Sequence, residues 1–289
     1  MFDNGLLKFY KYRAYRDGFL DTTEARIRED AGARVFDNTV KCSSPIGNFY
    51  KKFKHFFSKE TADAEILLSQ IYYGAGLNST IYTPASDGND LFLLCNDISK
   101  QNTIKAKDFH QLISLETGCS EAEIKSIMAN PNPSGSDIVK YFSQRALAQK
   151  IKTRVLDAAT LNPDRQESNY FYVLDESGNA VDVATLDYER SGIEATNKIA
   201  FGSHTTLNSG YQNDFGLTHA TPVAVIDAVK HSEFVNSVID VPSLAEEIGS
   251  IDVREVSLDV ARTTGYVVEP KYVDILSRSL DRTAEMLGK

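Results

Sequence analysis

The sequence predicts an α+β protein in two parts, a small part of strands with one helix and a larger, mostly helical part. Two observations support this division. Short strand patterns separated by turn residues fill much of residues 1–97, around one clear helical pattern. Apolar residues at helical spacing then dominate residues 98–289, with a strand–turn–strand pattern at 170–186 as the exception. We therefore expect two domains, residues 1–97 and residues 98–289.

Composition places the chain among soluble globular proteins. It has 289 residues, of which 42% are hydrophobic and 25% are charged. No run of 18 or more apolar residues predicts a membrane span, and the N-terminus lacks the pattern of a secretory signal. Three widely spaced cysteines without a C-x-x-C pattern favour a reducing compartment, so we expect a cytoplasmic site of action.

Charge is divided unevenly along the chain. Residues 1–60 carry 12 Lys and Arg against 8 Asp and Glu, whereas residues 61–289 carry 19 against 32. The acidic body argues against a general nucleic-acid binder. The basic N-terminal region is either an ordinary solvated surface or a site for a polyanion such as an inositol phosphate, a phosphoinositide or an acidic partner. The basic residues in question are Lys8, Lys11, Arg13, Arg16, Lys51 and Lys54.

The small part begins with a predicted strand at 35–42, a turn of small residues at 43–48 and a second strand at 49–57. Small side chains would let backbone N–H groups approach phosphates, but no G-x-G-x-x-G pattern is present, so an ordinary hairpin is equally open. A helix is expected from residue 58 to about residue 73, stopped by Gly74 and Gly76. Strands at 79–83 and 91–95 follow, joined by a turn at 87–90.

The larger part is expected to deliver a loop from its longest helix. That helix covers residues 137–159 and runs directly into residues 161–164. A strand at 170–174, a turn at 175–179 and a strand at 180–186 come next. The other predicted helices cover residues 106–116, 120–128 with a capping box at Ser120 and Glu123, 223–229, 253–262 and 271–287.

Two carboxylates and one amide are placed at the loop and the hairpin. Asp164 is followed five positions later by Asn169, and the second strand leads into Asp187. Phosphoryl transfer from ATP needs such a set, because one carboxylate accepts the proton of the attacking hydroxyl while an amide and another carboxylate hold Mg²⁺. Protein kinases have their catalytic Asp, metal-binding Asn and metal-binding Asp in the same order and spacing.

The segment Asp164-Arg165-Gln166-Glu167-Ser168-Asn169, with Leu186-Asp187-Tyr188 after the hairpin, resembles the D-R-H-x-x-N … I-D-F/Y motif of phosphatidylinositol 3-/4-kinase-like and HipA-like kinases. Gln166 stands where that branch usually has His. The resemblance implies a two-lobed protein-kinase-like fold that binds ATP with Mg²⁺ or Mn²⁺. It implies Asp164 as the base, and Asn169 and Asp187 as metal ligands.

The same resemblance implies a lysine on a strand of the small lobe and a glutamate on its helix. Lys52 is the expected phosphate-binding lysine, because Tyr50-Lys51-Lys52-Phe53 resembles the apolar-x-Lys-apolar strand of the family, while Lys51 and Lys54 stay open. Glu65 is the expected partner of that lysine, with Glu60 as the alternative.

Further roles follow from the resemblance. Cys95 and Asn96 lie at the expected hinge, where backbone groups would hydrogen-bond adenine. Arg165 is expected to pair with an acid and brace the loop. Asp157 resembles an acid of the related kinases, but its place near the end of the helix favours a surface acid.

Several functions stay open. A serine hydrolase would need G-x-S-x-G and a zinc hydrolase H-E-x-x-H, and both patterns are absent, whereas a glycosidase with two carboxylates is not excluded. If the protein is a kinase, a Ser or Thr of a protein is favoured as substrate over a phosphoinositide. AMP transfer at the same site, or a catalytically weak binding module, are the alternative functions. A single divergent kinase domain also resembles the kinases that bacteria inject into host cells, which would make the partner a host protein in the host cytosol.

Overall fold

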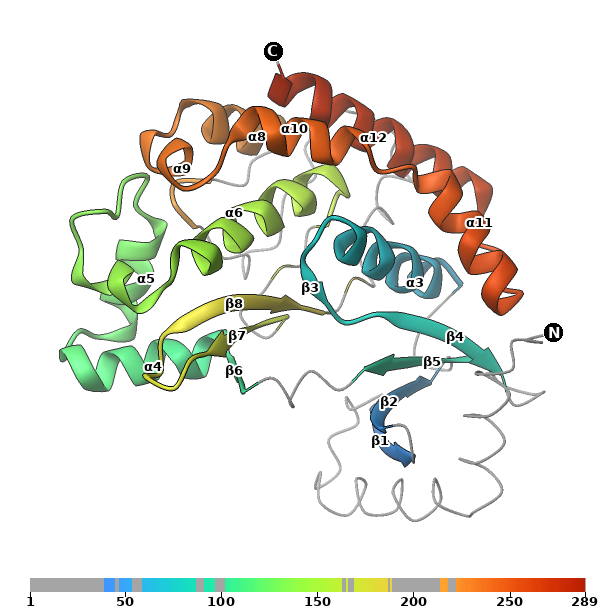
Figure 1. Ribbon diagram of the computed structural model, residues 1–289, viewed down its shortest axis with the longest axis horizontal. Coiled ribbons are helices and arrows are strands. Elements are labelled where there is room, and N and C mark those ends of the chain that lie inside the picture. Colours follow the sequence, from blue (N-terminus) through green and yellow to red (C-terminus); the bar gives the residue numbers. More distant parts are fainter. Residues whose placement is uncertain are drawn as a thin grey trace.

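The computed structural model describes residues 39–44, 47–53, 59–86, 91–96, 102–162, 165, 169–186, 188, 214–217 and 222–288 (Figure 1). Strands and helices are mixed as predicted, and the α+β class is confirmed. Within these residues, helices cover the strands on the side shown uppermost in Figure 1. None of the described helices has the length and apolar character needed to cross a membrane.

The first sheet has four antiparallel strands in the order β1-β2-β5-β4, namely β1 Thr39–Ser44, β2 Gly47–Phe53, β5 Leu91–Asn96 and β4 Tyr82–Ser86. The predicted turn at 43–48 is wrong in length, because Ser43 pairs with Asn48 and Ser44 with Gly47. Only residues 45 and 46 connect the strands.

Helix α3 Lys59–Gly74 and the hairpin of β4 and β5 agree with prediction. The predicted start of that hairpin, at residue 79, is wrong. Asn78 and Ser79 form strand β3, which pairs in parallel with residues 184–185 of another sheet, and the hairpin strand begins only at Tyr82. Gly76, with φ +72°, provides the left-handed turn between α3 and β3.

The second sheet has the order β3-β8-β7-β6, where β6 is Thr103–Lys105, β7 Tyr170–Leu174 and β8 Ala180–Thr185. The β7–β8 hairpin was predicted and is confirmed. Its turn is closed by Asp175, whose Oδ1 accepts hydrogen bonds from the backbone N–H groups of Ser177 and Asn179, both at 2.9 Å. The three-residue strand β6 was not predicted.

The predicted helix at 137–159 is interrupted. A 3₁₀ helix covers Asp137–Tyr141, and helix α6 begins only at Gln144 and ends at Ala159. Phe142 forms a bridge with Ala180, and the N–H of Ser143 donates to the Ala180 carbonyl at 2.8 Å. The backbone is therefore extended at this point because it pairs with β8, and the Ser143 hydroxyl then caps α6 by accepting from the Ala146 N–H.

The remaining helices include two, α9 and α10, that the sequence pattern did not predict. Besides α3 and α6, the described α-helices are α4 Ala106–Thr117, α5 Glu121–Ala129 with its predicted capping box, α8 Pro222–His231, α9 Glu233–Val238, α10 Val241–Gly249, α11 Val253–Thr264 and α12 Pro270–Gly288.

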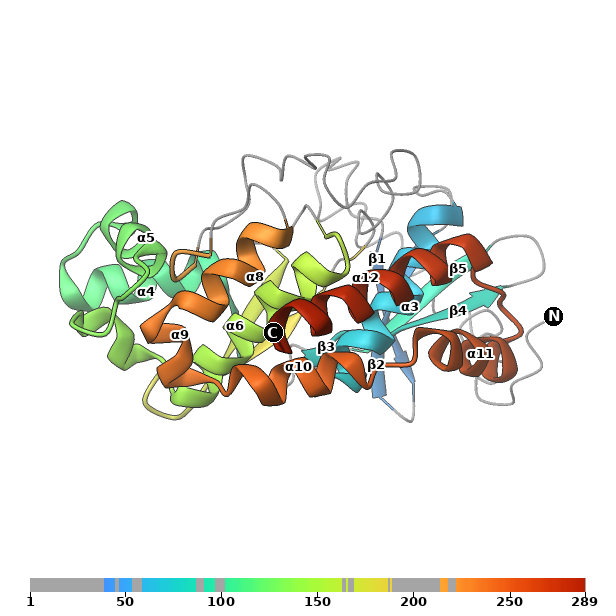
Figure 2. The same cartoon turned by 90° about the horizontal axis from the view of Figure 1, so that it is seen from above.

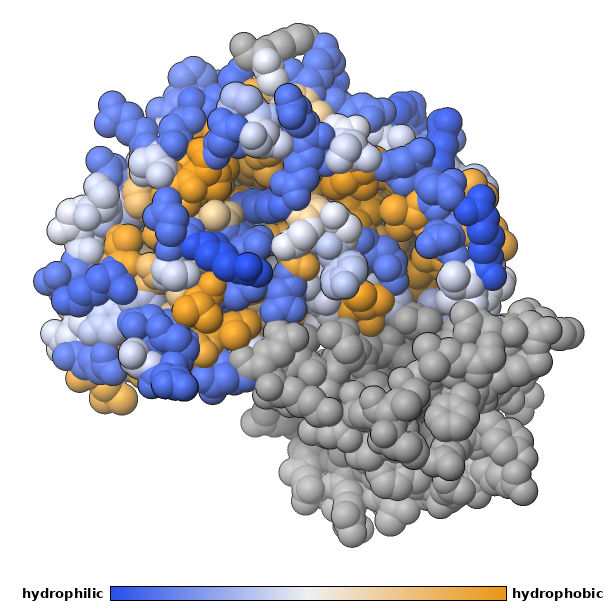
Figure 3. Space-filling model, viewed as in Figure 1, coloured by the Kyte–Doolittle hydropathy of each residue, from blue (hydrophilic) through white to orange (hydrophobic). Residues whose placement is uncertain are grey.

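Helix α6 is the central helix of the larger part. Its residues pack on β8 on one side and on α8, α9 and α12 on the other (Figure 2). Phe109 of α4, Phe142 and Tyr172 of β7 form an aromatic cluster next to it, with ring centroids 4.8–5.4 Å apart. On the face shown in Figure 3, hydrophilic residues cover most of the outer helices and hydrophobic ones show between them. The core thus holds the C-terminal end of α6 rigidly beside the β7–β8 hairpin.

Candidate active site

The end of α6 leads into the predicted catalytic loop through a defined turn. The N–H of Thr160 donates to the carbonyl of Leu156, and that of Asn162 donates to the carbonyl of Asp157, both at 2.8 Å. Leu161 has φ +56°, a left-handed conformation that is uncommon for a residue with a branched side chain. The chain therefore leaves the helix in a fixed direction immediately before residue 164.

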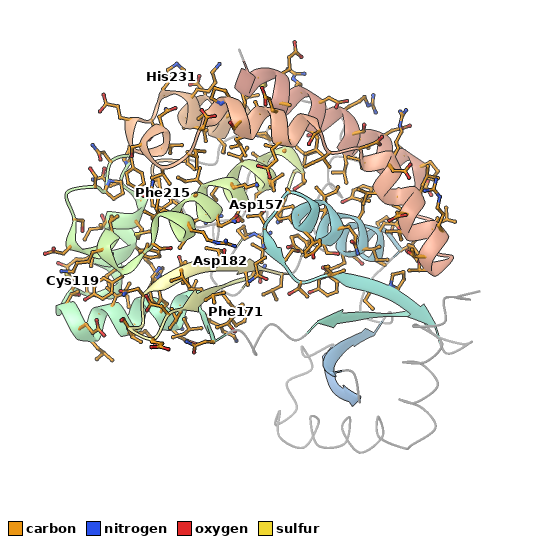
Figure 4. The ribbon with its side chains drawn as sticks, viewed as in Figure 1. Cys119, Asp157, Phe171, Asp182, Phe215 and His231 are labelled. Carbon is orange, nitrogen blue, oxygen red and sulfur yellow. The ribbon has the colours of Figure 1, made fainter. Side chains whose placement is uncertain are left out.

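Asp157 is not the surface acid that we expected. Its side chain is buried, near the centre of the molecule in Figure 4. Its Oδ1 accepts from the hydroxyl of Tyr72 on α3 at 2.8 Å and from the amide of Asn162 at 2.9 Å. The prediction failed because Tyr72 of α3, 85 positions away in the sequence, covers the end of α6 together with Asn162 and Arg165 of the loop that follows it.

Arg165 joins three segments through one buried guanidinium. Its Nη2 donates to Asp157 Oδ1 at 3.0 Å, and its Nε lies 3.2 Å from both oxygens of that carboxylate. Its Nη1 donates to the backbone carbonyls of Asn169 and Leu186, both at 2.8 Å. The expected ion pair with an acid is therefore present, and it connects helix α6, the loop and the end of β8.

Two tyrosine rings and the charge of Asp157 complete the surroundings of this guanidinium. Its central carbon lies 5.2 Å from the ring centre of Tyr188 and 5.8 Å from that of Tyr72. Burial alone would lower the pKa of Arg165, but the neighbouring Asp157 carboxylate outweighs it and raises the pKa above its ordinary value. Arg165 is therefore charged at neutral pH.

These contacts bring together backbone positions next to all three residues of the predicted motif. Arg165 follows Asp164, Asn169 carries one accepting carbonyl, and Leu186 precedes Asp187. The N–H of Leu186 also donates to the carbonyl of Asn169 at 3.2 Å. Asp164 and Asp187 themselves lie outside the described residues. Of the predicted metal ligands, Asn169 is the one whose side chain is described, and it is 7% exposed.

Glu65 reaches the same place from α3. Its side chain is fully buried, and its Oε2 accepts from the backbone N–H of Tyr188 at 3.0 Å. The hydroxyl of Tyr188 hydrogen-bonds to Ser79 and Thr185, both at 2.7 Å. Burial raises the pKa of Tyr188 to about 12, so this phenol stays protonated. The residue after Asp187 is therefore held from both its backbone and its side chain.

The register of the first sheet distinguishes the candidate lysines. Lys52 pairs with Leu93, and Leu93 pairs with Pro84 on the other side. Leu93 and Pro84 are buried. Lys51 pairs with Leu94, so the two lysines occupy successive positions of the ladder, and successive positions of a strand alternate between the two faces of a sheet.

The other predicted cofactor contacts are described only in part. Cys95 and Asn96 are the last two residues of β5, where only their backbone is described. Lys54 and the basic residues before 39 lie outside the described residues. Among the residues that the structure describes, no three His, Cys, Asp or Glu side chains form a group that could hold a metal ion.

A second buried ion pair was missed by the sequence analysis. Arg154 Nε donates to Asp214 Oδ2 at 2.7 Å, and Lys150 Nζ lies 3.2 Å from Asp214 Oδ1 and 2.6 Å from the Tyr172 hydroxyl. Burial alone would raise the pKa of Asp214, but Arg154 and Lys150 outweigh it and lower the pKa. The available signal was a pair of cations four residues apart on the apolar face of α6.

No protein-family model and no curated protein matches this sequence. Several solved structures are similar in the course of the chain, among them the following two. The Helicobacter pylori proinflammatory kinase CtkA has 13% identity and a TM-score of 0.49, over 87% of this chain and 93% of that one. HipA, in a Shewanella oneidensis MR-1 toxin–antitoxin complex with HipB and operator DNA, has 10% identity and a TM-score of 0.47, over 87% of this chain and 64% of that one. Both scores are below 0.5, so the function proposed next depends on the contacts of this chain alone.

Proposed function

We propose that this protein is an ATP- and Mg²⁺-dependent kinase that transfers the γ-phosphate to a hydroxyl group. The observation that carries the proposal is the buried guanidinium of Arg165, which gathers the backbone next to Asp164, Asn169 and Asp187 around one point. Phosphoryl transfer depends on positioning and on electrostatic stabilisation, and a rigid frame behind the reacting side chains provides the first.

Each residue has a distinct role in this proposal. Asp164 accepts the proton of the attacking hydroxyl, while Asn169 and Asp187 hold Mg²⁺. The bound Mg²⁺ would neutralise charge on the phosphates. Lys52 of β2, which pairs with Leu93 of β5, binds the phosphates, and the buried Glu65 of α3 positions that lysine.

The acceptor is proposed to be a Ser or Thr of a protein, with a phosphoinositide second. The acidic body of the chain favours a protein over an anionic lipid surface. We extend the proposal to a host protein as substrate of a bacterial effector, and to an inositol phosphate or acidic partner at the basic N-terminal region. AMP transfer at the same site is the alternative chemistry, and the position of the label in ATP separates the two.

The test is incubation with Mg²⁺ and ATP labelled on the γ-phosphate, with Asp164→Ala and Asp187→Ala beside the wild type. The wild type is expected to label itself or a generic protein acceptor, and each variant to lose at least about 100-fold in rate. Asp182→Asn is the matched control, because this carboxylate lies on β8 but pairs with the exposed Arg145 at 2.9 Å. It should keep wild-type labelling.

Other outcomes would change the proposal. Label retained only from α-labelled ATP would indicate AMP transfer. No label, together with a melting temperature that rises with ATP and Mg²⁺, would indicate a nucleotide-binding module without transfer. If the wild type shows no label and its melting temperature does not shift with ATP and Mg²⁺, both group transfer and nucleotide binding are refuted.

A further inference from the structure

Helix α3, which carries Glu65, is also held from its other side by the C-terminal helices. Asp63 lies two residues before Glu65 and its side chain is only 1% exposed. Its Oδ1 accepts from the hydroxyl of Tyr266 at 2.7 Å, and its Oδ2 accepts from the backbone N–H of Glu269 at 3.0 Å. A buried carboxylate needs such donors, because an unpaired buried charge is very costly.

Lys59 joins the same group from the first turn of α3. Its Nζ lies 2.8 Å from Asp63 Oδ2 and donates to the carbonyl of Val267 at 3.1 Å. It also lies 5.2 Å from the centre of the Tyr266 ring. We call Lys59, Asp63, Tyr266 and the backbone of residues 267–269 the α3 latch.

The part of the latch outside α3 is the short connection between α11 and α12, and this connection is rigid. Helix α11 ends at Thr264, and the C-cap residue Gly265 has φ +73° and donates its N–H to the Ala261 carbonyl. The hydroxyl of Thr264 accepts from the N–H of Tyr266 at 3.1 Å. Val268 is buried, and Pro270 then begins α12. The connection therefore presents its donors at fixed positions.

Electrostatics agree with this geometry. Burial, followed by the hydrogen bond to Asp63, raises the pKa of Tyr266, so its hydroxyl remains a donor. Burial, followed by the charges of Asp63 and Glu65, also raises the pKa of Tyr272 on α12.

Successive residues of a helix are turned by about 100°, so Asp63 and Glu65 lie roughly 200° apart around the axis of α3. One side of the helix is fixed to the segment after β8 through Glu65, and another is fixed to the α11–α12 connection through Asp63. Contacts on two sides oppose rotation of α3 and its movement away from the site.

We propose that the α3 latch is a positioning element that keeps Glu65 in place for phosphoryl transfer, an inference that depends on the kinase function proposed above. The latch residues do not touch the reacting groups; they act through α3. In this protein the helix is held by the connection between the chain's own C-terminal helices.

Two variants test the latch. Asp63→Asn keeps the size of the side chain, but its NH₂ group cannot accept, so at least one donor loses its partner. Tyr266→Phe removes a single hydroxyl and retains the ring next to Lys59. Arg254→Ala is the matched control, because Arg254 of α11 and Asp274 of α12 form an exposed ion pair at 3.0 Å that does not involve α3.

The measurement is kcat and KM for ATP in the γ-phosphate assay, well below the melting temperature of every variant. We expect kcat to fall about tenfold in Asp63→Asn and about threefold in Tyr266→Phe, since small misplacements are costly, with KM for ATP within about twofold of wild type. Hydrogen exchange of α3 amides should become faster in both. The control should match the wild type in all three quantities.

The failures are distinguishable. Wild-type transfer with unchanged kcat in both variants, even with a lower melting temperature, would refute the latch and leave the kinase function standing. No transfer by the wild type would refute the kinase function and with it the catalytic role of the latch. If Asp63→Asn fails to fold, Tyr266→Phe alone decides.

Discussion

Arg165 and Asp157 form an ion pair that is buried on both partners, and Arg165 also binds the backbone carbonyls of Asn169 and Leu186. Removing one member of such a pair leaves the other charge buried without its partner. Arg165→Ala is therefore expected to lower the free energy of unfolding by about 3–5 kcal/mol, measured by urea denaturation. Arg254→Ala, which breaks an exposed ion pair, should lower it by about 1 kcal/mol or less. Equal effects of the two changes would contradict this prediction.

Asp214 shows why a motif must be judged by its surroundings. Residues 214–216 have the sequence Asp-Phe-Gly, a motif whose aspartate holds Mg²⁺ in protein kinases. In the structure the Asp214 carboxylate is fully buried against Arg154 and Lys150. The Asp214 carboxylate is therefore occupied by two cations of α6, and Asp187 remains the candidate metal ligand.

The segment 214–217 docks on the end of α5 through its backbone. The N–H of Phe215 donates to the carbonyl of Met128 at 2.7 Å, and that of Gly216 to the carbonyl of Ala129 at 2.9 Å. Gly216 has φ +71°, and a Cβ added there would lie 2.6 Å from Pro131 Cγ and 3.0 Å from Pro131 Cα. This position therefore requires glycine for its conformation and for the close approach.

Gly216→Ala is expected to destabilise the protein more than Gly178→Ala does. Gly178 in the β7–β8 turn has φ +81°, but its added Cβ would meet nothing within 4 Å. Gly178→Ala should lower the free energy of unfolding by about 1–2 kcal/mol, because of the backbone conformation alone. Gly216→Ala should lower it by a further amount of about 1–3 kcal/mol, because the added Cβ clashes with Pro131. Urea denaturation of both variants measures the difference, and similar costs would show that Pro131 moves aside.

Elements with strong local signals were predicted correctly. The β7–β8 hairpin has turn chemistry at Asp175 and Gly178, and α3 has a helical apolar pattern ended by glycine. The interruption before α6 was not predictable, because Ser143 leaves the helical path only to pair with Ala180, which is 37 positions away.

The residues of the candidate site were likewise predictable only in part. The order and spacing of Asp164, Asn169 and Asp187 are local properties, so the sequence could suggest them. The burial of Asp157 and the latch at Asp63 depend on helices far along the chain, and no local pattern reports them.

At the scale of the whole molecule, α3 belongs as much to the larger part as to the small sheet. Strand β3, directly after α3, pairs in parallel with β8, and Tyr72 of α3 donates to Asp157 at the end of α6. The α3 latch adds contacts to the connection between α11 and α12. A boundary near residue 97 therefore separates segments of sequence that share one core around α3.

We expect residues 59–82 to unfold together with residues 102–162 and 222–288 as one cooperative unit, because shared burial couples the stability of segments in contact. Native-state hydrogen exchange should give the slowest amides of α3, α6, β8 and α12 the same free energy of opening, with the same dependence on urea. In Arg165→Ala these amides should all lose protection by a similar amount. Slow amides of α3 that open at clearly lower free energy than those of α6 would show that α3 is a separate unit. Such a helix could move during catalysis, so this measurement also decides whether the position of Glu65 is fixed or adjustable.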